Sequence, residues 1–349
     1  MSVKQNIIPI PMRYIINTAV IFAFLIVGNI ITQGGILTGA WNNTVIEIGI
    51  FIILAISLNL VTGYLGQLPL GHAGFMAVGA YTVGIFWRSG IISAAGPALF
   101  VGILLGGIVA AIFGIIIGIP ALRLRGDYLA IITLGFGEII RILITNLDGF
   151  TGGALGLTLP AEFSFQRAAF QFSPFLVVFI CVVICCTVIH MLMKSRHGRA
   201  ILSIRDNEIA AESCGINTTY YKVMAFVVSA FFAGVAGALF AANLGFLEPG
   251  EFAFMQSINI LMIVVLGGMG SIVGSIVSAS ILTSLPLVMQ FLAEWRMVIF
   301  ALILVIVMIF KPTGLMGSYD FSLSRILEKI IVWFRAKKGG KAGVENGEA

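Results

Sequence analysis

The sequence predicts an all-α, polytopic integral membrane protein with about ten transmembrane helices (roughly eight to ten). Of its 349 residues, 59% are hydrophobic and 10% are charged, whereas soluble domains are about 45–50% apolar and about 25% charged. Several uninterrupted apolar runs approach the roughly 20 residues that a helix needs to cross a bilayer. Their continuity favours helices over the alternating strands of a membrane barrel.

The apolar segments follow one another along most of the chain, separated by short polar stretches. The first outruns the ~7–15-residue core of a signal peptide and lacks a clean cleavage site, so we expect an uncleaved helix. The third, eighth and ninth are interrupted by glycine, proline or polar residues. We expect spans at 14–32, 44–62, 68–87, 97–119, 128–145, 172–193, 223–245, 256–274, 276–293 and 297–311. Two five-span halves would start on opposite sides of the membrane, which is the parity of an inverted repeat.

Small residues recur every four positions in two of these segments. This spacing places them on one helix face, where two backbones approach closely. It favours packing within the subunit over a dimer contact. The residues are Gly102, Gly106, Ala110, Gly114 and Gly118 in the fourth segment, and Ala230, Gly234, Ala238 and Ala242 in the seventh.

The basic residues predict the orientation of the chain. When the spans are threaded alternately from a cytoplasmic N-terminus, nearly all of the 20 Lys and Arg residues fall on the cytoplasmic side. The exceptions are Arg88, Arg141, Arg167 and Arg296. Cytoplasmic loops of membrane proteins carry such an excess of positive charge, so the net charge of +5 requires no nucleic-acid partner.

This threading predicts a multi-pass protein of the cell membrane (inner or plasma membrane) with both termini in the cytoplasm. We expect a transmembrane domain over residues 1–320 and a basic cytoplasmic tail over residues 321–349. Residues 194–222 would form a cytoplasmic loop within the first of these.

The loop at 194–222 concentrates charge in an otherwise apolar chain. From Arg199 to Ser213 it lacks proline and glycine, which predicts about four turns of helix, ended by Gly215. We expect an apolar side of Ile201, Ile204 and Ile209, an exposed Arg205–Glu208 pair at i,i+3, and an N-cap of the next span at Asn217. A plain solvated loop is the alternative, but about 29 residues is long for one. An amphipathic helix between two spans is a rigid element to which a cytoplasmic partner can bind.

SRHGRAILSIRDNEIAAESCGIN, residues 195–217, resembles the cytoplasmic coupling loop of ABC-importer permeases. It departs from the broad E-A-A-x-x-x-G form, because Glu208 lies seven residues before Gly215 and no I-x-L-P follows. The departure fits the branched-chain amino-acid permeases of the LivM type. Four further blocks resemble that family in order: SLNLVTGYLGQLPLGHAGFMAVGAYT (57–82), RGDYLAIITLGFGEIIRILITNLDGFTGG (125–153), KVMAFVVSAFFAGVAGALFA (222–241) and VLGGMGSIVGSIVSA (265–279).

The resemblance implies the permease fold of ABC importers and a set of partners. These are a second permease subunit (giving a heterodimer), two cytoplasmic ATP-binding subunits, and a periplasmic or extracellular receptor that delivers a small-molecule amino acid. The loop would then couple to the ATPase through Arg205, Asp206, Glu208, Glu212 and Gly215. Urea and amide permeases share much of the pattern, so they remain an alternative.

The residues themselves favour a chain that is not an enzyme. No G-x-x-x-x-G-K-[ST] motif occurs, so any ATP must bind to another subunit. No Ser/His/Asp, Cys/His or close carboxylate arrangement predicts catalysis. The 4 cysteines include no C-x-x-C and the 3 histidines are far apart, so we expect neither a metal nor a cofactor.

The substrate path has candidates in two interrupted regions. TGYLGQLPLGHAGF, residues 62–75, breaks an apolar region with glycines and a proline, and such backbone is tolerated at membrane depth only inside protein or beside water. A re-entrant turn at the surface is an equal alternative. In the fifth span, the i,i+3 spacing of Glu138 and Arg141 favours mutual pairing over contact with substrate. The candidate path residues are Asn59, Gln67, His72, Glu138, Arg141 and Thr151.

We therefore expect a permease subunit that imports branched-chain or related apolar amino acids, driven by ATP on separate subunits. The Gly- and Thr-rich outer loop at 146–160 would contact the receptor or serve as a flexible connector. The rival from another class is a secondary transporter working alone. That rival would need several acidic residues inside the membrane, and Glu138 alone lies well inside a predicted span.

Overall fold

The structure, a computed structural model, describes residues 10–35, 38–92, 95–122, 127–165 and 172–289, together with Leu302, Val305, Ile309 and Gly314. The chain divides into two compact units, and helix α1 (Ile10–Gln33) of the first coincides with the first expected span. The second unit, Gly35–Tyr319, holds the other described elements. Nearly all of the expected span at 297–311, and the whole tail at 321–349, lie outside the described residues.

Helices make up most of the second unit, because apolar segments in a helix satisfy their backbone polar groups internally. The longer ones are α2 (Gly39–Asn59), α3 (His72–Ser89), α4 (Ala95–Ala121), α5 (Asp127–Asn146), α7 (Pro174–Lys194), α10 (Thr218–Leu244), α11 (Phe254–Gly267) and α12 (Ile272–Val288). Within the described ranges, five helices are long and apolar enough to cross a membrane: α2 with its π-helical continuation η1 (Leu60–Tyr64), α4, α5, α7 and α10. A helical, polytopic architecture is thus confirmed, and the total of about ten spans stays a prediction.

Several of the expected boundaries are wrong: α2 begins at Gly39 instead of residue 44, α10 begins at Thr218 instead of residue 223, and two others move at glycine-containing turns. The third span starts at His72 instead of residue 68, because residues 65–71 have no helical structure and Gly66 has a φ of +75°. The eighth and ninth spans were expected to meet near residue 275, but the turn between α11 and α12 lies at residues 268–271. Gly268 and Gly270 adopt φ values of +106° and +85° there, a region that side-chain-bearing residues rarely enter.

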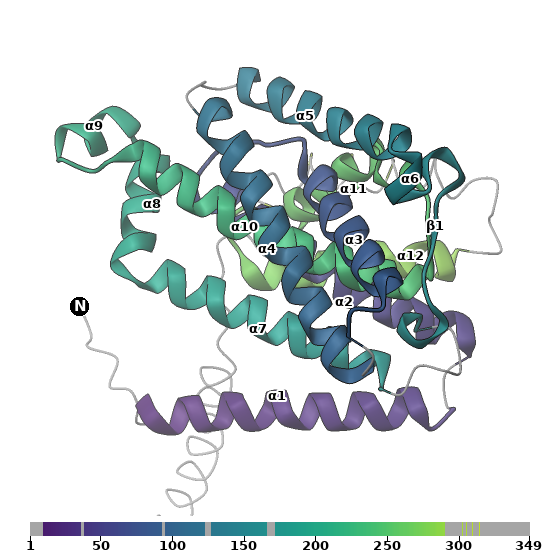
Figure 1. The fold of residues 1–349 in the computed structure, drawn as a ribbon. Helices are drawn as coiled ribbons and strands as arrows, with labels where there is room; N and C mark the ends of the chain where they lie inside the picture. The colour runs from purple at the N-terminus through teal and green to yellow at the C-terminus, as the bar shows by residue number, and fades with distance from the viewer. Residues whose placement is uncertain are drawn as a thin grey trace, which may run out of the picture. The chain divides into compact units, whose positions relative to one another are not determined.

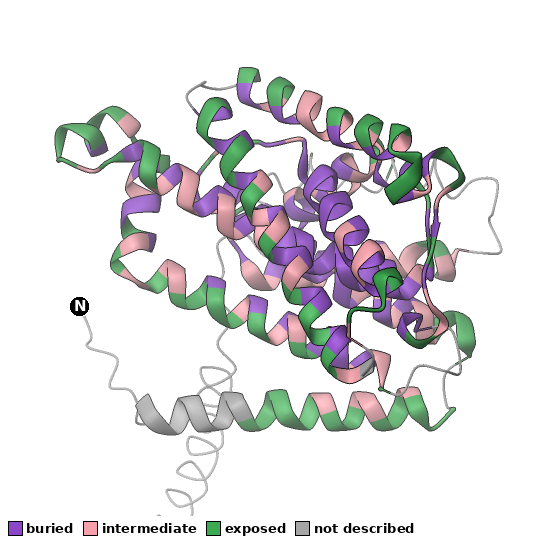
Figure 2. Ribbon diagram, in the orientation of Figure 1, coloured by how far each residue is buried: buried purple, intermediate pink, exposed green. Residues whose placement is uncertain are grey.

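The core of the unit lies around α2, α3 and α10, the most continuously buried helices in Figure 2. α10 packs along α3 and α4. A Cβ placed on Gly114 of α4 would lie 2.7 Å from the Ala230 Cβ of α10, and one on Gly106 would lie 2.8 Å from a Val83 methyl carbon of α3. The small-residue stripes therefore pack inside the subunit, as expected.

Short elements gather at two opposite ends of the bundle (Figure 1). At one end are α8 (Arg196–Asp206) and α9 (Glu208–Ser213), which join α7 to α10. At the other are α6 (Asp148–Thr151) and β1 (Leu157–Thr158), where β1 pairs antiparallel with β2 (Phe246–Leu247). Three 3-10 turns, η2 (Gly153–Leu155), η3 (Ala161–Phe163) and η4 (Pro249–Phe252), complete the connections.

Candidate functional site

The charged loop forms two helices and not the single helix expected from Arg199 to Ser213. The break falls at Asn207, whose backbone is extended (φ −160°, ψ 108°). The Asn207 side-chain oxygen accepts a hydrogen bond from the Ala210 N–H at 3.0 Å and so caps α9. Asparagine is among the best N-cap residues, and this local preference is the signal that could have predicted the break. Ser195 caps α8 in the same way, accepting from the His197 N–H at 3.1 Å.

The expected pair between Arg205 and Glu208 is also wrong, because the break directs the two side chains to different helices. Arg205 donates from Nη1 to the Gly63 carbonyl oxygen at 3.1 Å and forms an ion pair with Asp206 at 3.2 Å. Glu208 instead pairs with Lys222 of α10 at 2.7 Å. One helix of the loop is thus fastened to the end of α2, and the other to the start of α10.

The end of α9 is stabilised by a turn at Gly215, as expected. Gly215 has a φ of +81°, its N–H donates to the Glu212 carbonyl at 2.9 Å, and the Ile216 N–H donates to the Ala211 carbonyl at 3.1 Å. This is the Schellman pattern. Glu212 also accepts a hydrogen bond from the Thr218 hydroxyl at 3.2 Å, so it holds the turn to the start of α10. Asn217 caps α10 through the Tyr220 N–H at 3.0 Å, as expected.

The apolar side of the loop is smaller than expected. Ile201 and Ile204 of α8 are buried, but Ile209 of α9 is 66% exposed. The side chain of Asp206 is 71% exposed. The outer surface of this end therefore combines a charged side chain with one large apolar side chain.

Asn59 connects the end of α2 to the turn between α11 and α12. Its Oδ1 accepts from the Gly270 N–H at 2.8 Å, and its Nδ2 donates to the Ser271 carbonyl and the Ser275 hydroxyl, both at 3.0 Å. A Cβ on Gly63 would collide with the Gly270 backbone. Gly63 and Gly270 are not among the candidates predicted from the sequence, yet they lie between Arg205 and Asn59 in one continuous set of contacts.

The other path candidates do not converge on one cavity. His72 is buried and lies 3.0 Å from the Ser57 hydroxyl. Gln67 is half-buried, and its backbone N–H donates to the Val61 carbonyl at 3.0 Å. Thr151 is buried and donates to the Ile144 carbonyl at 2.6 Å, which stabilises the chain where α5 gives way to α6.

Glu138 and Arg141 pair near the middle of α5, as their spacing predicted. Arg141 Nε lies 2.7 Å from Glu138 Oε2. The second carboxylate oxygen, Oε1, accepts a hydrogen bond from the Phe254 N–H at 3.0 Å, at the first residue of α11. Glu138 therefore joins α5 to a helix that lies more than 100 residues further along the chain.

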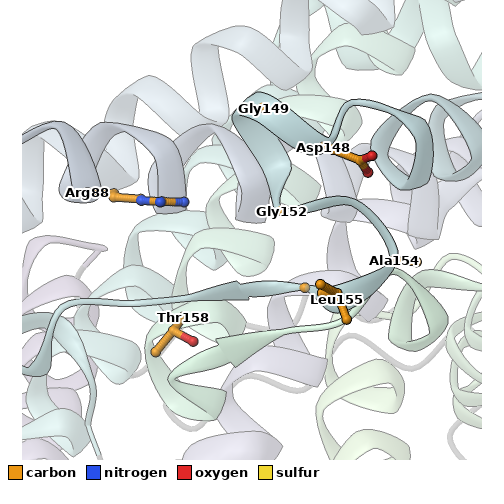
Figure 3. A pocket seen from close by; sticks show the side chains of 8 residues that line it. Arg88, Asp148, Gly149, Gly152, Ala154, Leu155 and Thr158 are labelled. Atoms are coloured by element: carbon orange, nitrogen blue, oxygen red, sulfur yellow. The ribbon is translucent and has the colours of Figure 1, made fainter.

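An open cleft of about 770 Å³ lies at the end of the bundle opposite α8 and α9. Figure 3 shows Arg88 extending from the end of α3 into the space between α6 and the segment that carries Leu155 and Thr158. Its lining comes largely from the loop at 146–160: Arg88, Asp148, Gly149, Gly152, Ala154, Leu155, Gly156 and Thr158. Among the described residues, no group of three or more His, Cys, Asp or Glu side chains is placed to hold a metal ion.

Comparison with known proteins identifies the family. Residues 41–308 match the model of the family described as branched-chain amino acid transport system / permease component. The chain belongs to this permease family. The match runs from α2 past α12, so it includes the α8–α9 loop, the Glu138–Arg141 pair and the cleft. The resemblance seen in the sequence is thereby confirmed.

Several curated permeases are similar to this one. It is 40% identical to the high-affinity branched-chain amino acid transport system permease protein LivM of Salmonella typhimurium, over 76% of this chain and 68% of that protein. LivM of Escherichia coli is 39% identical with the same coverage. LivH of Salmonella typhimurium, the permease protein of a system with the same description, is 28% identical over 76% of this chain and 91% of LivH. No solved structure matches.

Proposed function

We propose that this permease is the membrane subunit of an ATP-driven importer, and that it carries branched-chain or related apolar amino acids into the cytoplasm. The similarity to LivM supports the substrate class, because LivM is described as a branched-chain amino acid permease. The similarity to LivH supports a second, related permease subunit, since both permeases resemble this chain over 76% of its length. The substrate would cross between the two subunits.

The attachment of α8 to the end of α2, and of α9 to α10, is the observation that favours transport driven by ATP. A loop that only connects two spans needs no fixed shape, whereas an element that transmits force must be rigidly joined to the helices it moves. Here Arg205 bonds to Gly63 at 3.1 Å and Glu208 pairs with Lys222 at 2.7 Å. The exposed Asp206 and Ile209 would then contact an ATP-binding subunit, one such subunit serving each permease.

The distribution of basic residues supports a cytoplasmic position for α8 and α9. Lys194, Arg196, Arg199, Arg205 and Lys222 lie in or next to these helices, whereas Arg88 lies at the opposite end, by the cleft. Positive charge accumulates on the cytoplasmic side of membrane proteins. The cleft would therefore open outward, where a soluble receptor delivers the amino acid, and both termini would be cytoplasmic.

Uptake by membrane vesicles tests this function. The permease is expressed with the subunits encoded beside it, and accumulation of radiolabelled leucine is measured with and without ATP and receptor. We expect accumulation only when both are present. Accumulation without the ATP-binding subunits would support a transporter working alone, and uptake of urea in place of leucine would move the substrate to the amide class.

A further inference from the structure

The Glu138–Arg141 pair lies on the most exposed of the five long apolar helices. Only 22% of the apolar stretch of α5 is buried, against 72% for α10 and 78% for α2. Near the middle of α5, the side chain of Glu138 is 29% exposed and that of Arg141 is 32% exposed. The pair therefore reaches the lateral surface of this subunit.

A lipid environment for that surface is unfavourable. Charged side chains within membrane spans nearly always face protein or a water-filled cavity, because hydrocarbon does not solvate them. α4 provides the comparison, since it carries no charged side chain and exposes apolar ones: Phe100, Val101, Leu104, Ile108, Ile112, Ile115, Ile116 and Ile119. α5 likewise exposes apolar side chains, such as Ile139 and Ile142, but it adds a charged pair to its surface, and that pair requires protein or water beside it.

The hydrogen bonds within the subunit do not use the full bonding capacity of the two charged side chains. Glu138 accepts from Arg141 and from the Phe254 N–H. No described residue bonds to the terminal nitrogens of Arg141, which holds Glu138 through Nε alone. The cavity behind Glu138, between α3, α5 and α11, has a volume of about 10 Å³, which is room for about one water molecule. A larger ligand must therefore approach from the exposed side of α5.

We propose that Glu138 and Arg141 bind the α-ammonium and α-carboxylate groups of the amino acid as it passes between α5 and the second permease subunit. This inference rests on the proposed function. Each side chain exchanges its partner for the opposite charge on the substrate, so an already neutral pair binds a neutral zwitterion and no net charge enters the membrane. Arginine suits the role, because its planar group binds a carboxylate through two N–H donors.

The pairing has a consequence for selectivity. Both side chains recognise the groups that all amino acids share, so the pair admits any zwitterion and leaves the choice of side chain to other residues. Urea and simple amides carry no formal charges, so they offer neither side chain an ionic partner in exchange for the one it would give up. The site therefore favours amino acids over the amide class.

Direct binding to the complete transporter tests the proposal. Radiolabelled leucine is titrated onto the complex in lipid nanodiscs without receptor, because a receptor would impose its own selectivity. In the wild type, leucine should bind at least tenfold more tightly than leucinamide, which lacks the carboxylate. The double variant Glu138→Gln with Arg141→Gln removes both charges together and leaves neither unpaired. It should bind leucine at least tenfold more weakly and lose the preference over leucinamide.

The outcomes separate this inference from the proposed function. If the double variant assembles and binds leucine with wild-type affinity and preference, the pair is purely structural and the inference is overturned, while the proposed function stands. If the wild-type complex shows no ATP-driven leucine uptake, the proposed function fails and the inference fails with it. Assembly is checked by ATP hydrolysis and by the amount of complex in the membrane.

Thiol labelling tests the water-lined surface independently of affinity. In a cysteine-free background, Ile139→Cys and Ile142→Cys place a thiol on α5, while Ile112→Cys and Ile116→Cys place one on α4. The positions on the two helices are matched in exposure, because the side chains are 51% and 51% exposed on α5 and 49% and 60% exposed on α4. A water-soluble thiol reagent should label the α5 positions at least tenfold faster, and leucine should slow that labelling. Equal rates on both helices would overturn the proposal.

Discussion

Lys222 Nζ lies 2.7 Å from Glu208 Oε1, and the Lys222 side chain is only 3% exposed although it lies near the start of a membrane helix. An ammonium group buried to this degree needs a carboxylate partner, because desolvation of an unpaired charge is costly. The pair thus fixes α9 to α10. It joins residues that lie 14 positions apart, too far for any i,i+3 or i,i+4 spacing to predict it.

Removing the carboxylate should loosen α9. In Glu208→Ala the buried ammonium loses this partner, and we expect the attachment of α9 to weaken by about 1–3 kcal/mol. Hydrogen exchange of residues 208–216 measures the change. Asp206→Ala is the matched control, since its exposed pair contributes about 0–1 kcal/mol. Adding Lys222→Met to Glu208→Ala should restore slow exchange, and unchanged exchange in Glu208→Ala alone would contradict the anchoring role.

Arg205 should couple ATP hydrolysis to transport without being required for docking. Its guanidinium bonds to Gly63 at the end of α2 at 3.1 Å, so Arg205→Ala cuts this link but leaves the exposed surface of α9 in place. We expect the assembled complex to hydrolyse ATP at near wild-type rates while leucine uptake falls at least tenfold. Arg196→Ala, at the exposed start of α8, serves as the control. A parallel loss of hydrolysis and uptake would instead place Arg205 at the docking contact.

Gly215 should be replaceable only by residues that tolerate a positive φ. No neighbouring atom lies within 4 Å of a Cβ placed there, so a side chain has room. The substitution is limited instead by the backbone φ of +81°. Gly215→Val should displace α9, leaving membrane levels normal but abolishing co-purification of the ATP-binding subunit and uptake. Gly215→Asn should retain most of both, because asparagine adopts this conformation at lower cost. Full activity in the valine variant would rule out a docking role for this turn.

The orientation can be tested with two exposed positions at opposite ends of the bundle. Cys214 follows α9, and Thr158 lies in β1 beside the cleft. In a background without the three cysteines of α7, a membrane-impermeant thiol reagent should label Thr158→Cys in intact cells. Cys214 should react only after the membrane is permeabilised. Labelling of Cys214 in intact cells would show that the protein lies in the membrane in the opposite orientation to the one predicted.

The sequence by itself determined the features that depend on composition or on nearest helical neighbours. Continuous apolar runs predicted the helical membrane class, because apolar side chains need a non-aqueous surrounding whatever the fold. The four-residue stripes predicted close packing, and the i,i+3 spacing predicted the Glu138–Arg141 pair, because these contacts follow from the geometry of a single helix. The caps at Gly215 and Asn217 are local in the same sense.

Tertiary structure alone decided the contacts that join distant segments. Arg205 meets Gly63 across 142 positions, and Asn59 meets Gly270 across 211. Such contacts depend on how α2, α8 and the turn before α12 are placed in space, which no local pattern encodes. Arg205 and Glu208 show the difference most clearly. Their spacing was compatible with a pair, but the cap at Asn207 turned the chain, and each side chain bonded to the helix that packing had brought within reach.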